Sequence, residues 1–118
     1  MDTRLETIRL PGLTPYAPML EHQHARRAAV ARGDAPNTLF LLEHAPVITL
    51  GRRADAAHLL HDEAALRARG IEALAADRGG DVTYHGPGQL VAYPVLCLHE
   101  WTPSVGWYLR ALEDVLIA

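Results

Sequence analysis

Short runs rich in β-branched and aliphatic residues recur along the chain, separated by Gly, Pro, Asp and Asn. Runs of this composition, bounded by turn-forming residues, are typical of β-strands. The two runs that flank His44-Ala45-Pro46 predict two strands around a short turn. In all, we expect strands over residues 4–10, 38–43, 47–50, 71–76, 82–85 and 90–98.

Three longer stretches carry helix start signals instead, and the first two also carry stop signals. Thr14 can cap a helix that has Pro15 at its first position, and Gly33 would end that helix. Asp55 can cap a second helical stretch, which runs to Arg69. A third helix begins at Ser104 and repeats apolar side chains on one face at spacings of three and four: Val105, Leu109, Leu112, Val115 and Leu116.

The composition is that of a globular protein. The chain has 118 residues, of which 49% are hydrophobic and 21% charged, enough for one small domain with one core. It contains no internal repeat, low-complexity tract or linker, so we expect a single domain. The net charge of −3 gives no general reason to expect a nucleic-acid partner.

The cysteine content and the N-terminal residues bear on the compartment. The single Cys97 excludes an intramolecular disulfide and suits a reducing environment. Asp2, Arg4 and Glu6 place charges where a signal peptide needs an apolar run. The longest uncharged apolar stretch, residues 90–98, is too short to span a bilayer. We therefore expect a soluble cytoplasmic protein without a membrane partner.

The segment 78–89 combines bare backbone with polar side chains. Four of its residues are glycine, namely Gly79, Gly80, Gly86 and Gly88. Glycine lets the backbone take positive φ and lets a ligand approach the peptide groups closely. Arg78 and His85 add a cation and an imidazole. The segment is either a substrate cradle or two tight turns that flank a strand.

The order of residues in this segment resembles the signature of the lipoyl(octanoyl) transferases, the acyltransferase branch of the biotin/lipoate protein ligase family. Segments 12–16, 43–52 and 88–94 resemble further blocks of that family, in the same order. In the related ligases an Asp usually follows the His and an Asn closes the motif. Here Gly86-Pro87-Gly88-Gln89 follows His85, which favours the transferase branch.

The resemblance implies an α/β fold in which a mixed sheet packs against helices, the biotin/lipoate protein ligase-like (class II synthetase-like) fold. It implies transfer of an octanoyl group from octanoyl-acyl carrier protein through an enzyme Cys thioester. The acceptor would be a lysine of the lipoyl domains of 2-oxoacid dehydrogenases and of the glycine cleavage system. No cofactor and no metal are implied.

The resemblance also assigns site residues. One stretch would line the acyl substrate pocket: Arg78, Gly79, Gly80, Asp81, Val82, Thr83, Tyr84 and His85. Asp81 departs from the family, which often has Gln at that position. The catalytic Cys and the accompanying Lys of the family would lie beyond residue 118. We therefore expect residues 1–118 to be a C-terminally truncated catalytic domain, inactive by itself and incomplete in its sheet.

Several other interpretations stand beside this one. Cys97 lies between leucines in an expected strand, where a free Cys usually acts as a small hydrophobe, and not as a nucleophile. His58 and His61 have a spacing that suits one helix face, but no third ligand falls at a recognised spacing. An ATP-dependent lipoate or biotin ligase would be expected to use a Lys on the nucleotide phosphates, and the chain has none. A catalytically dead acyl-binding or carrier-binding module is the third alternative.

Overall fold

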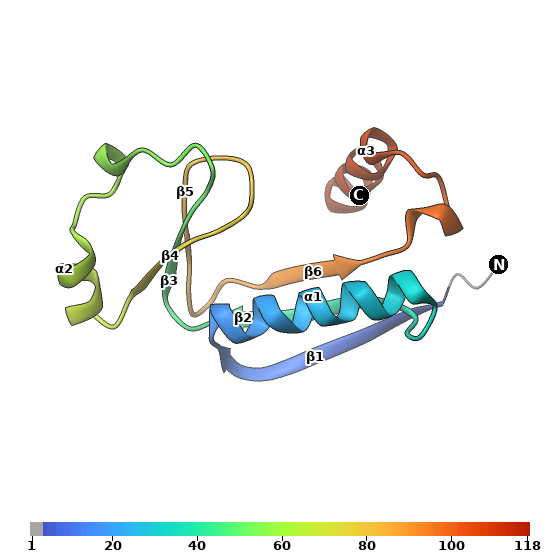
Figure 1. The fold of residues 1–118 in the computed structure, drawn as a ribbon, viewed down its shortest axis with the longest axis horizontal. Coiled ribbons are helices and arrows are strands. Elements are labelled where there is room, and N and C mark those ends of the chain that lie inside the picture. Colours follow the sequence, from blue (N-terminus) through green and yellow to red (C-terminus); the bar gives the residue numbers. More distant parts are fainter. Residues whose placement is uncertain (1–3) are drawn as a thin grey trace.

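The computed structural model describes residues 4–118, which form both strands and helices (Figure 1). Two 3₁₀ turns, Ala56–His58 and Leu98–Glu100, interrupt the longer connections. The elements in chain order are β1 (Leu5–Thr14), α1 (Tyr16–Arg32), β2 (Asn37–His44), β3 (Val47–Leu50), α2 (Glu63–Ala68), β4 (Glu72–Ala75), β5 (Val82–His85), β6 (Val91–Val95) and α3 (Val105–Ile117).

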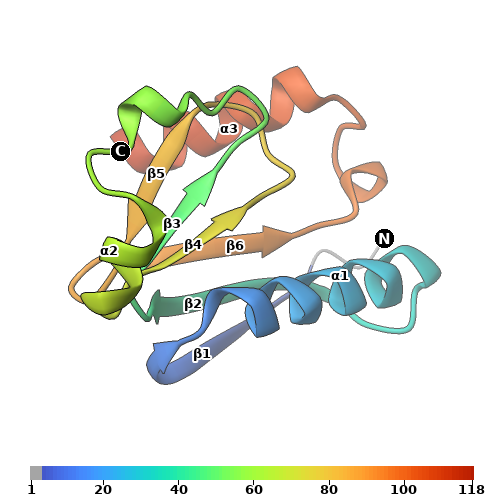
Figure 2. The same cartoon turned by 60° about the vertical axis from the view of Figure 1, so that its left-hand side comes forward.

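The strands form two sheets of three strands each, in the orders β1-β2-β6 and β4-β3-β5. In each sheet the central strand pairs with one parallel and one antiparallel neighbour, so both sheets are mixed. The α/β class with mixed sheets and helices is confirmed, but the strands divide between two sheets where one was expected. β2 and β3 do flank a short turn, yet they do not pair, because Ala45 and Pro46 carry the chain from one sheet to the other (Figure 2).

Helix α1 connects the parallel strands β1 and β2 and lies over the first sheet (Figure 1). A crossover of this kind is what parallel pairing of consecutive strands requires. Met19 from the helix and Phe40 and Leu42 from β2 form the core. Partly buried side chains surround these three: Ile8, Leu10, Val91, Tyr93 and Val95.

The start of α1 differs from the expected cap. Thr14 is the last residue of β1, where it pairs with His44, so its side chain does not cap the helix. Pro15 occupies the cap position with φ −59° and ψ 142°, and its carbonyl accepts from Met19 N–H at 3.3 Å. The helix ends as predicted at Gly33, whose φ of +80° is the left-handed conformation that glycine adopts without strain.

The stretch after Asp55 is not one continuous helix. The Asp55 carboxylate accepts from Ala57 N–H at 2.9 Å and caps only the first 3₁₀ turn. A second carboxylate, Asp62, accepts from Ala65 N–H at 2.8 Å and starts α2 separately. Asp side chains that bond to the local backbone compete with helix continuation, which explains the break.

Each outer strand of the first sheet contains a proline. The register of β1 shifts between Arg9 and Leu13, where Pro11 lies and Gly12 takes a φ of +67°. Pro94 stands inside β6, and the strand ends at Val95 instead of continuing through residue 98. The pairing of β1 with β2 therefore resumes only at Leu13.

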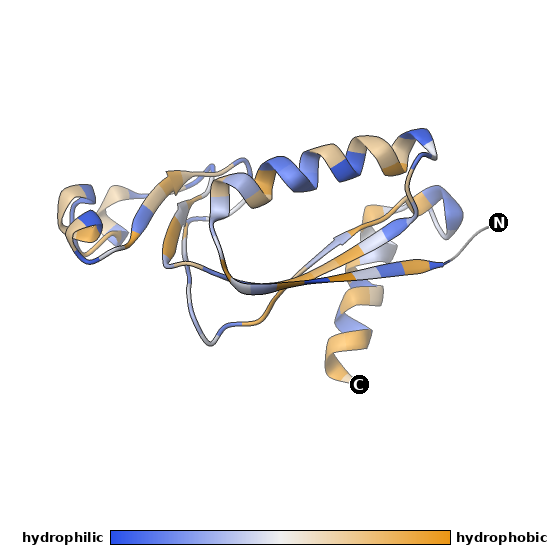
Figure 3. Ribbon diagram, turned by 90° about the horizontal axis from the view of Figure 1, so that it is seen from below, coloured by the Kyte–Doolittle hydropathy of each residue, from blue (hydrophilic) through white to orange (hydrophobic). Residues whose placement is uncertain are grey.

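Helix α3 begins as expected at Ser104, whose hydroxyl accepts from Trp107 N–H at 3.2 Å. Its apolar residues are largely exposed, with Val115, Leu116 and Ile117 between 73% and 85% accessible, and hydrophobic colour runs to its end in Figure 3. Within residues 4–118, no helix combines the length and the apolar character needed to cross a lipid bilayer.

Candidate functional site

Arg78 holds the glycine-bearing loop against strand β3. Its guanidinium donates to the hydroxyl of Thr49 from Nε at 3.1 Å and from Nη2 at 2.7 Å. Nη2 also donates to the Thr49 carbonyl at 2.7 Å and to the Asp81 carbonyl at 3.0 Å. Nη1 donates to Gly79 O at 2.9 Å. The Arg78 side chain thus binds two carbonyls of its own loop and links that loop to Thr49 of β3.

Backbone hydrogen bonds fix the same loop to the end of β3. Three consecutive N–H groups donate to its carbonyl oxygens: Gly51 to Asp81 at 2.8 Å, Arg52 to Arg78 at 2.9 Å and Arg53 to Gly80 at 2.9 Å. The N–H groups of Gly79 and Gly80 take no part in these bonds. Gly80 has a φ of +93°, a conformation that an L side chain rarely adopts.

Asp81 ties a second segment to the loop. Its carboxylate accepts from the backbone N–H of Asp55 at 2.8 Å and bonds the Nδ1 atom of His58. The hydrogen bond from Asp55 N–H, reinforced by His58 and Arg78, lowers the pKa of Asp81. Asp81 therefore connects the loop to the 3₁₀ turn that follows β3.

The remaining residues of the predicted stretch form β5. Val82 and His85 are partly buried, whereas Thr83 and Tyr84 are exposed. The Tyr84 side chain is half exposed and lies over Gly86, where a Cβ atom would overlap its hydroxyl. Tyr84 is therefore not a core aromatic residue.

Four aromatic side chains from four elements meet at the end of β5. The His44 ring lies 5.2 Å from the ring of Tyr16, 5.9 Å from that of His85 and 5.7 Å from that of Tyr93. Tyr16 begins α1, His44 ends β2, His85 ends β5, and Tyr93 lies in β6. We call these four residues the His44 cluster.

The hydrogen bonds of His44 define its protonation. Its Nδ1 lies 2.9 Å from the Thr14 carbonyl, which can only accept, so Nδ1 carries the proton. Its Nε2 lies 2.7 Å from the Tyr93 hydroxyl and accepts from it in the neutral ring. Burial lowers the pKa of the fully buried His44, and burial raises the pKa of Tyr93 to about 12. Both groups are held neutral.

The second glycine turn is attached to the cluster and to β2. His85 Nδ1 lies 2.6 Å from Gln89 Oε1, and Gln89 N–H donates to Gly86 O at 3.2 Å. Gly88, at φ +87°, donates its N–H to the Glu43 carboxylate at 2.6 Å. The loop, the turn and the end of β2 thus form one connected unit.

Sequence reasoning singled out His85 but not its aromatic neighbours. Tyr16 and Tyr93 stand inside the segments 12–16 and 88–94 that carry the family resemblance. Their place in those segments was the available signal. Their convergence on His44 required the fold, because Tyr93 is 49 residues away from it in sequence.

Cys97 lies away from this unit. Gln89 precedes β6, whereas Cys97 follows the other end of that strand. The backbone N–H of Cys97 donates to the Asn37 side chain at 2.7 Å. The thiol is partly buried. Cys97 therefore belongs to the connection between β6 and α3.

The two histidines with helix-like spacing bond different groups. His58 bonds Asp81, and His61 Nε2 lies 2.9 Å from Arg69 Nη1. His58 ends the 3₁₀ turn and His61 lies in the connection before α2, so the two residues do not share a helix face. Among residues 4–118, His, Cys, Asp and Glu form no group of three that could hold a metal ion.

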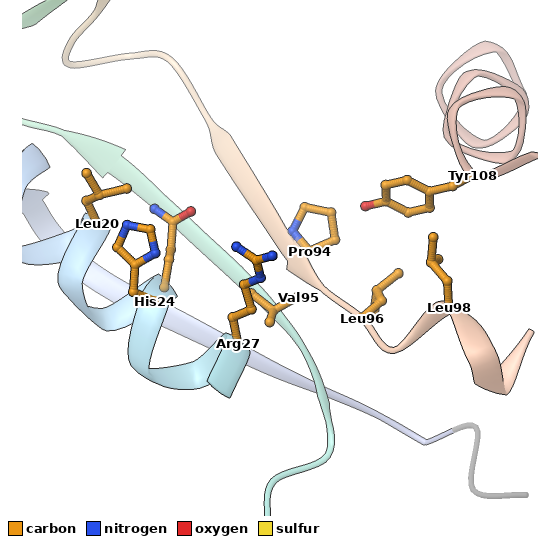
Figure 4. A pocket seen from close by; sticks show the side chains of 9 residues that line it. Leu20, His24, Arg27, Pro94, Val95, Leu96, Leu98 and Tyr108 are labelled. Atoms are coloured by element: carbon orange, nitrogen blue, oxygen red, sulfur yellow. The ribbon is translucent and has the colours of Figure 1, made fainter. Parts of the chain in front are cut away.

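A pocket of about 330 Å³ lies between α1, β6 and α3 (Figure 4). Its walls are mostly aliphatic, and Arg27 and His24 of α1 and Tyr108 of α3 supply polar groups. Its lining contains no residue of the 78–85 stretch. This pocket is thus separate from the loop and the His44 cluster.

The sequence of this chain is similar to those of known proteins. The sequence model described as "Lipoyl protein ligase A/B catalytic domain" matches residues 15–118. The octanoyltransferase of Gloeobacter violaceus is 52% identical over 91% of this chain and 46% of its own length. Those of Solibacter usitatus and Rubrobacter xylanophilus are 48% and 50% identical, over 93% and 96% of this chain.

The chain spans about half the length of these curated relatives, 46–51% of each. A solved structure of a T. acidophilum protein with bound lipoic acid is 21% identical, with a TM-score of 0.49, over 78% of this chain and 36% of that one.

Proposed function

Because the chain belongs to the lipoyl protein ligase A/B catalytic-domain family, we propose that it forms the N-terminal part of an octanoyltransferase. The reaction is the transfer of an octanoyl group from octanoyl-acyl carrier protein to a lysine of a lipoyl domain. Acceptors are the lipoyl domains of 2-oxoacid dehydrogenases and of the glycine cleavage system. An acyltransferase of this kind needs no ATP, which separates it from the ligase branch.

One observation carries the proposal for the site. The 78–85 stretch has a clamped arginine, two glycines with N–H groups outside the loop's own bonds, and an imidazole next to the buried His44. Backbone N–H groups held in a fixed loop can donate to the carbonyl oxygen of a thioester as negative charge develops on it. We assign this role to Gly79 and Gly80.

The other residues of the stretch hold the cradle in shape. Arg78 and Asp81 fix it to β3 and to the 3₁₀ turn, and Val82 and Thr83 pair it with β3. His85 packs beside His44 within the His44 cluster. Tyr84 is exposed and available to the acyl-pantetheine arm or its carrier protein.

The nucleophile and its activating amine come from elsewhere in the family domain. A Cys thiolate suits exchange between thioesters, and a nearby ammonium lowers the thiol pKa. The sequence of this chain has no Lys, and Cys97 stands beyond the far end of β6. We therefore propose that residues 1–118 form one incomplete domain that binds the acyl group without turning it over.

The test uses two proteins. The first is this chain, and the second is a chimera in which Ala118 is followed by the second half of the R. xylanophilus octanoyltransferase. Each is incubated with octanoyl-acyl carrier protein and a lipoyl domain, with and without ATP. We expect no transfer by the chain and ATP-independent transfer by the chimera. Transfer that requires ATP would favour a ligase, and acyl binding without transfer by the chimera would favour a dead module.

Two variants of the chimera locate the site. His85→Ala should slow single-turnover acyl transfer with little change in melting temperature. Cys97→Ser is the matched control and should leave transfer unchanged. Normal transfer by His85→Ala would show that His85 is not part of the site. Loss of transfer in Cys97→Ser would indicate that Cys97 is the nucleophile.

A further inference from the structure

Gln89 is held in place on both sides of its own turn. Its N–H donates to Gly86 O at 3.2 Å, and the preceding Gly88 donates its N–H to the Glu43 carboxylate at 2.6 Å. The turn is thereby anchored to β2 as well as to itself. The Gln89 side chain then reaches back four residues, and its Oε1 lies 2.6 Å from Nδ1 of His85.

This contact fixes where the proton of His85 resides. An amide oxygen has lone pairs and no hydrogen, so the hydrogen in the bond belongs to Nδ1. In a neutral imidazole only one ring nitrogen is protonated, which leaves Nε2 with a free lone pair. Nε2 is separated from Nδ1 by the ring atom Cε1, and the lone pairs of the two nitrogens diverge, so Nε2 is not aimed at Gln89. Among residues 4–118, no group forms a hydrogen bond with Nε2 of His85.

His44 has the same tautomer but a different use. Its Nδ1 donates to Thr14 O, and its Nε2 is occupied by the Tyr93 hydroxyl. The two rings are 5.9 Å apart, so two imidazoles with protonated Nδ1 stand side by side. Both ring nitrogens of His44 form hydrogen bonds within the protein. In His85 only Nδ1 does so, and Nε2 is available to a ligand.

We propose that Gln89 is a positioning residue that holds His85 as the Nδ1–H tautomer and thereby presents Nε2 as a hydrogen-bond acceptor at the acyl-transfer site. The inference rests on the proposed function for the identity of the ligand. The groups that Nε2 would receive are N–H or S–H donors, such as the attacking amine or thiol of a transfer reaction. With the opposite tautomer, Nε2 would carry hydrogen and could not accept.

The experiment reads the tautomer directly in this chain, without any need for turnover. Long-range proton–nitrogen NMR correlations on protein labelled with ¹⁵N-histidine distinguish a protonated Nδ1 from a protonated Nε2. The spectra are recorded at a pH where the imidazoles are neutral, and His85→Asn identifies the His85 signals. We expect the Nδ1–H pattern for His85.

Two variants separate positioning from packing. Gln89→Glu keeps an acceptor-only oxygen at the same reach, so it should retain the Nδ1–H pattern at His85. Gln89→Leu has a similar volume but no acceptor, so most of the Nδ1–H pattern should be lost while the His44 pattern stays unchanged. A wild-type His85 in the Nε2–H form, or an unchanged His85 pattern in Gln89→Leu, would overturn the inference.

A second measurement tests the proposed acyl binding separately from the role of Gln89. Octanoyl-acyl carrier protein is added to the labelled chain, with the unacylated carrier protein as control. If the acyl group binds at the cradle, the His85 Nε2 resonance should shift with the acylated carrier only. The expected tautomer without such a shift would support the role of Gln89 in positioning His85 and count against acyl binding at this loop.

Discussion

The guanidinium of Arg78 donates to both oxygens of Thr49, the hydroxyl and the backbone carbonyl, at 2.7 Å each. Thr49 is fully buried in β3, 29 residues before Arg78. The pair joins the loop to the sheet that supports it, and both bonds come from Nη2 of a charged donor.

The first prediction concerns this pair. Thr49→Val keeps the shape of the side chain but removes the hydroxyl, so Nε of Arg78 loses its acceptor, while Nη2 keeps the carbonyls of Thr49 and Asp81. We expect a loss of about 1–3 kcal/mol in the free energy of unfolding, the range for a buried donor left unpaired. Urea unfolding measures this loss. The control is Thr83→Val. Thr83 pairs with Thr49 on the neighbouring strand but is exposed, so this change should affect stability little.

The second prediction concerns the close approach of Gly51 to the loop. A Cβ atom on Gly51 would overlap the carbonyl oxygen of Gly80 and stand 2.7 Å from Arg78 Nη1. The first obstacle is backbone, so Gly51→Ala should displace the loop and cost about 1–3 kcal/mol or more. Thermal unfolding gives the size of the effect.

Gly79→Ala is its matched control, because the nearest atom to a Cβ there is Arg52 Nη2 at 3.8 Å. That variant should stay within about 0.5 kcal/mol of the wild type. Equal losses in the two variants would show that the loop does not pack on Gly51 as described.

The third prediction is a pH dependence from His44. Burial lowers the pKa of His44 below its ordinary value of 6.5, so the unfolded chain binds this proton more readily than the native one. Its contribution to stability is therefore complete above pH 6.5 and declines as the pH falls towards the lowered native pKa. One proton gives a slope of at most about 1.4 kcal/mol per pH unit.

Urea unfolding of the wild type and of His44→Asn between pH 5 and 8 tests this dependence. The pKa of Asp81 is also lowered, from 3.8, so its loss of stabilisation occurs below this window. The difference in stability between the two proteins should shrink as the pH falls. A difference independent of pH would contradict the neutral, buried His44.

The fourth prediction concerns Asn37, which is 3% exposed at the start of β2. Its side chain accepts from Cys97 N–H at 2.7 Å and donates to the Glu100 carboxylate. Asn37→Leu should leave the Cys97 N–H unpaired, lower stability by about 1–3 kcal/mol and speed hydrogen exchange in residues 97–100. Glu100→Gln retains an oxygen acceptor and should have a smaller effect. Unchanged exchange at Cys97 would refute the anchoring role.

The sequence predicted the elements better than their pairing. The β-rich runs gave every strand, and Gly33 and Ser104 marked a helix end and a helix start, because these signals are local. The division into two sheets depends on where Ala45 and Pro46 direct the chain, which no periodicity encodes. Thr14 had the right chemistry for a cap, but pairing with His44 kept it in the strand.

The same distinction applies to the site. The glycines, Arg78 and His85 were visible as a pattern within one segment of the sequence. The contacts of Arg78 with Thr49 and of His44 with Tyr93 join residues 29 and 49 positions apart, so only the folded chain brings them together. The loop could be predicted from its composition, whereas its support could not.

The prolines in the outer strands of the first sheet have a consequence for how the protein behaves in concentrated solution. An uninterrupted edge strand is a template onto which a second molecule can add a strand of its own. The register shift around Pro11 and Gly12 breaks that template on the β1 side, and Pro94, which has no N–H, breaks it on the β6 side. Neither edge of this sheet can extend into a continuous ladder between molecules, so growth of intermolecular β-structure is obstructed at both sides.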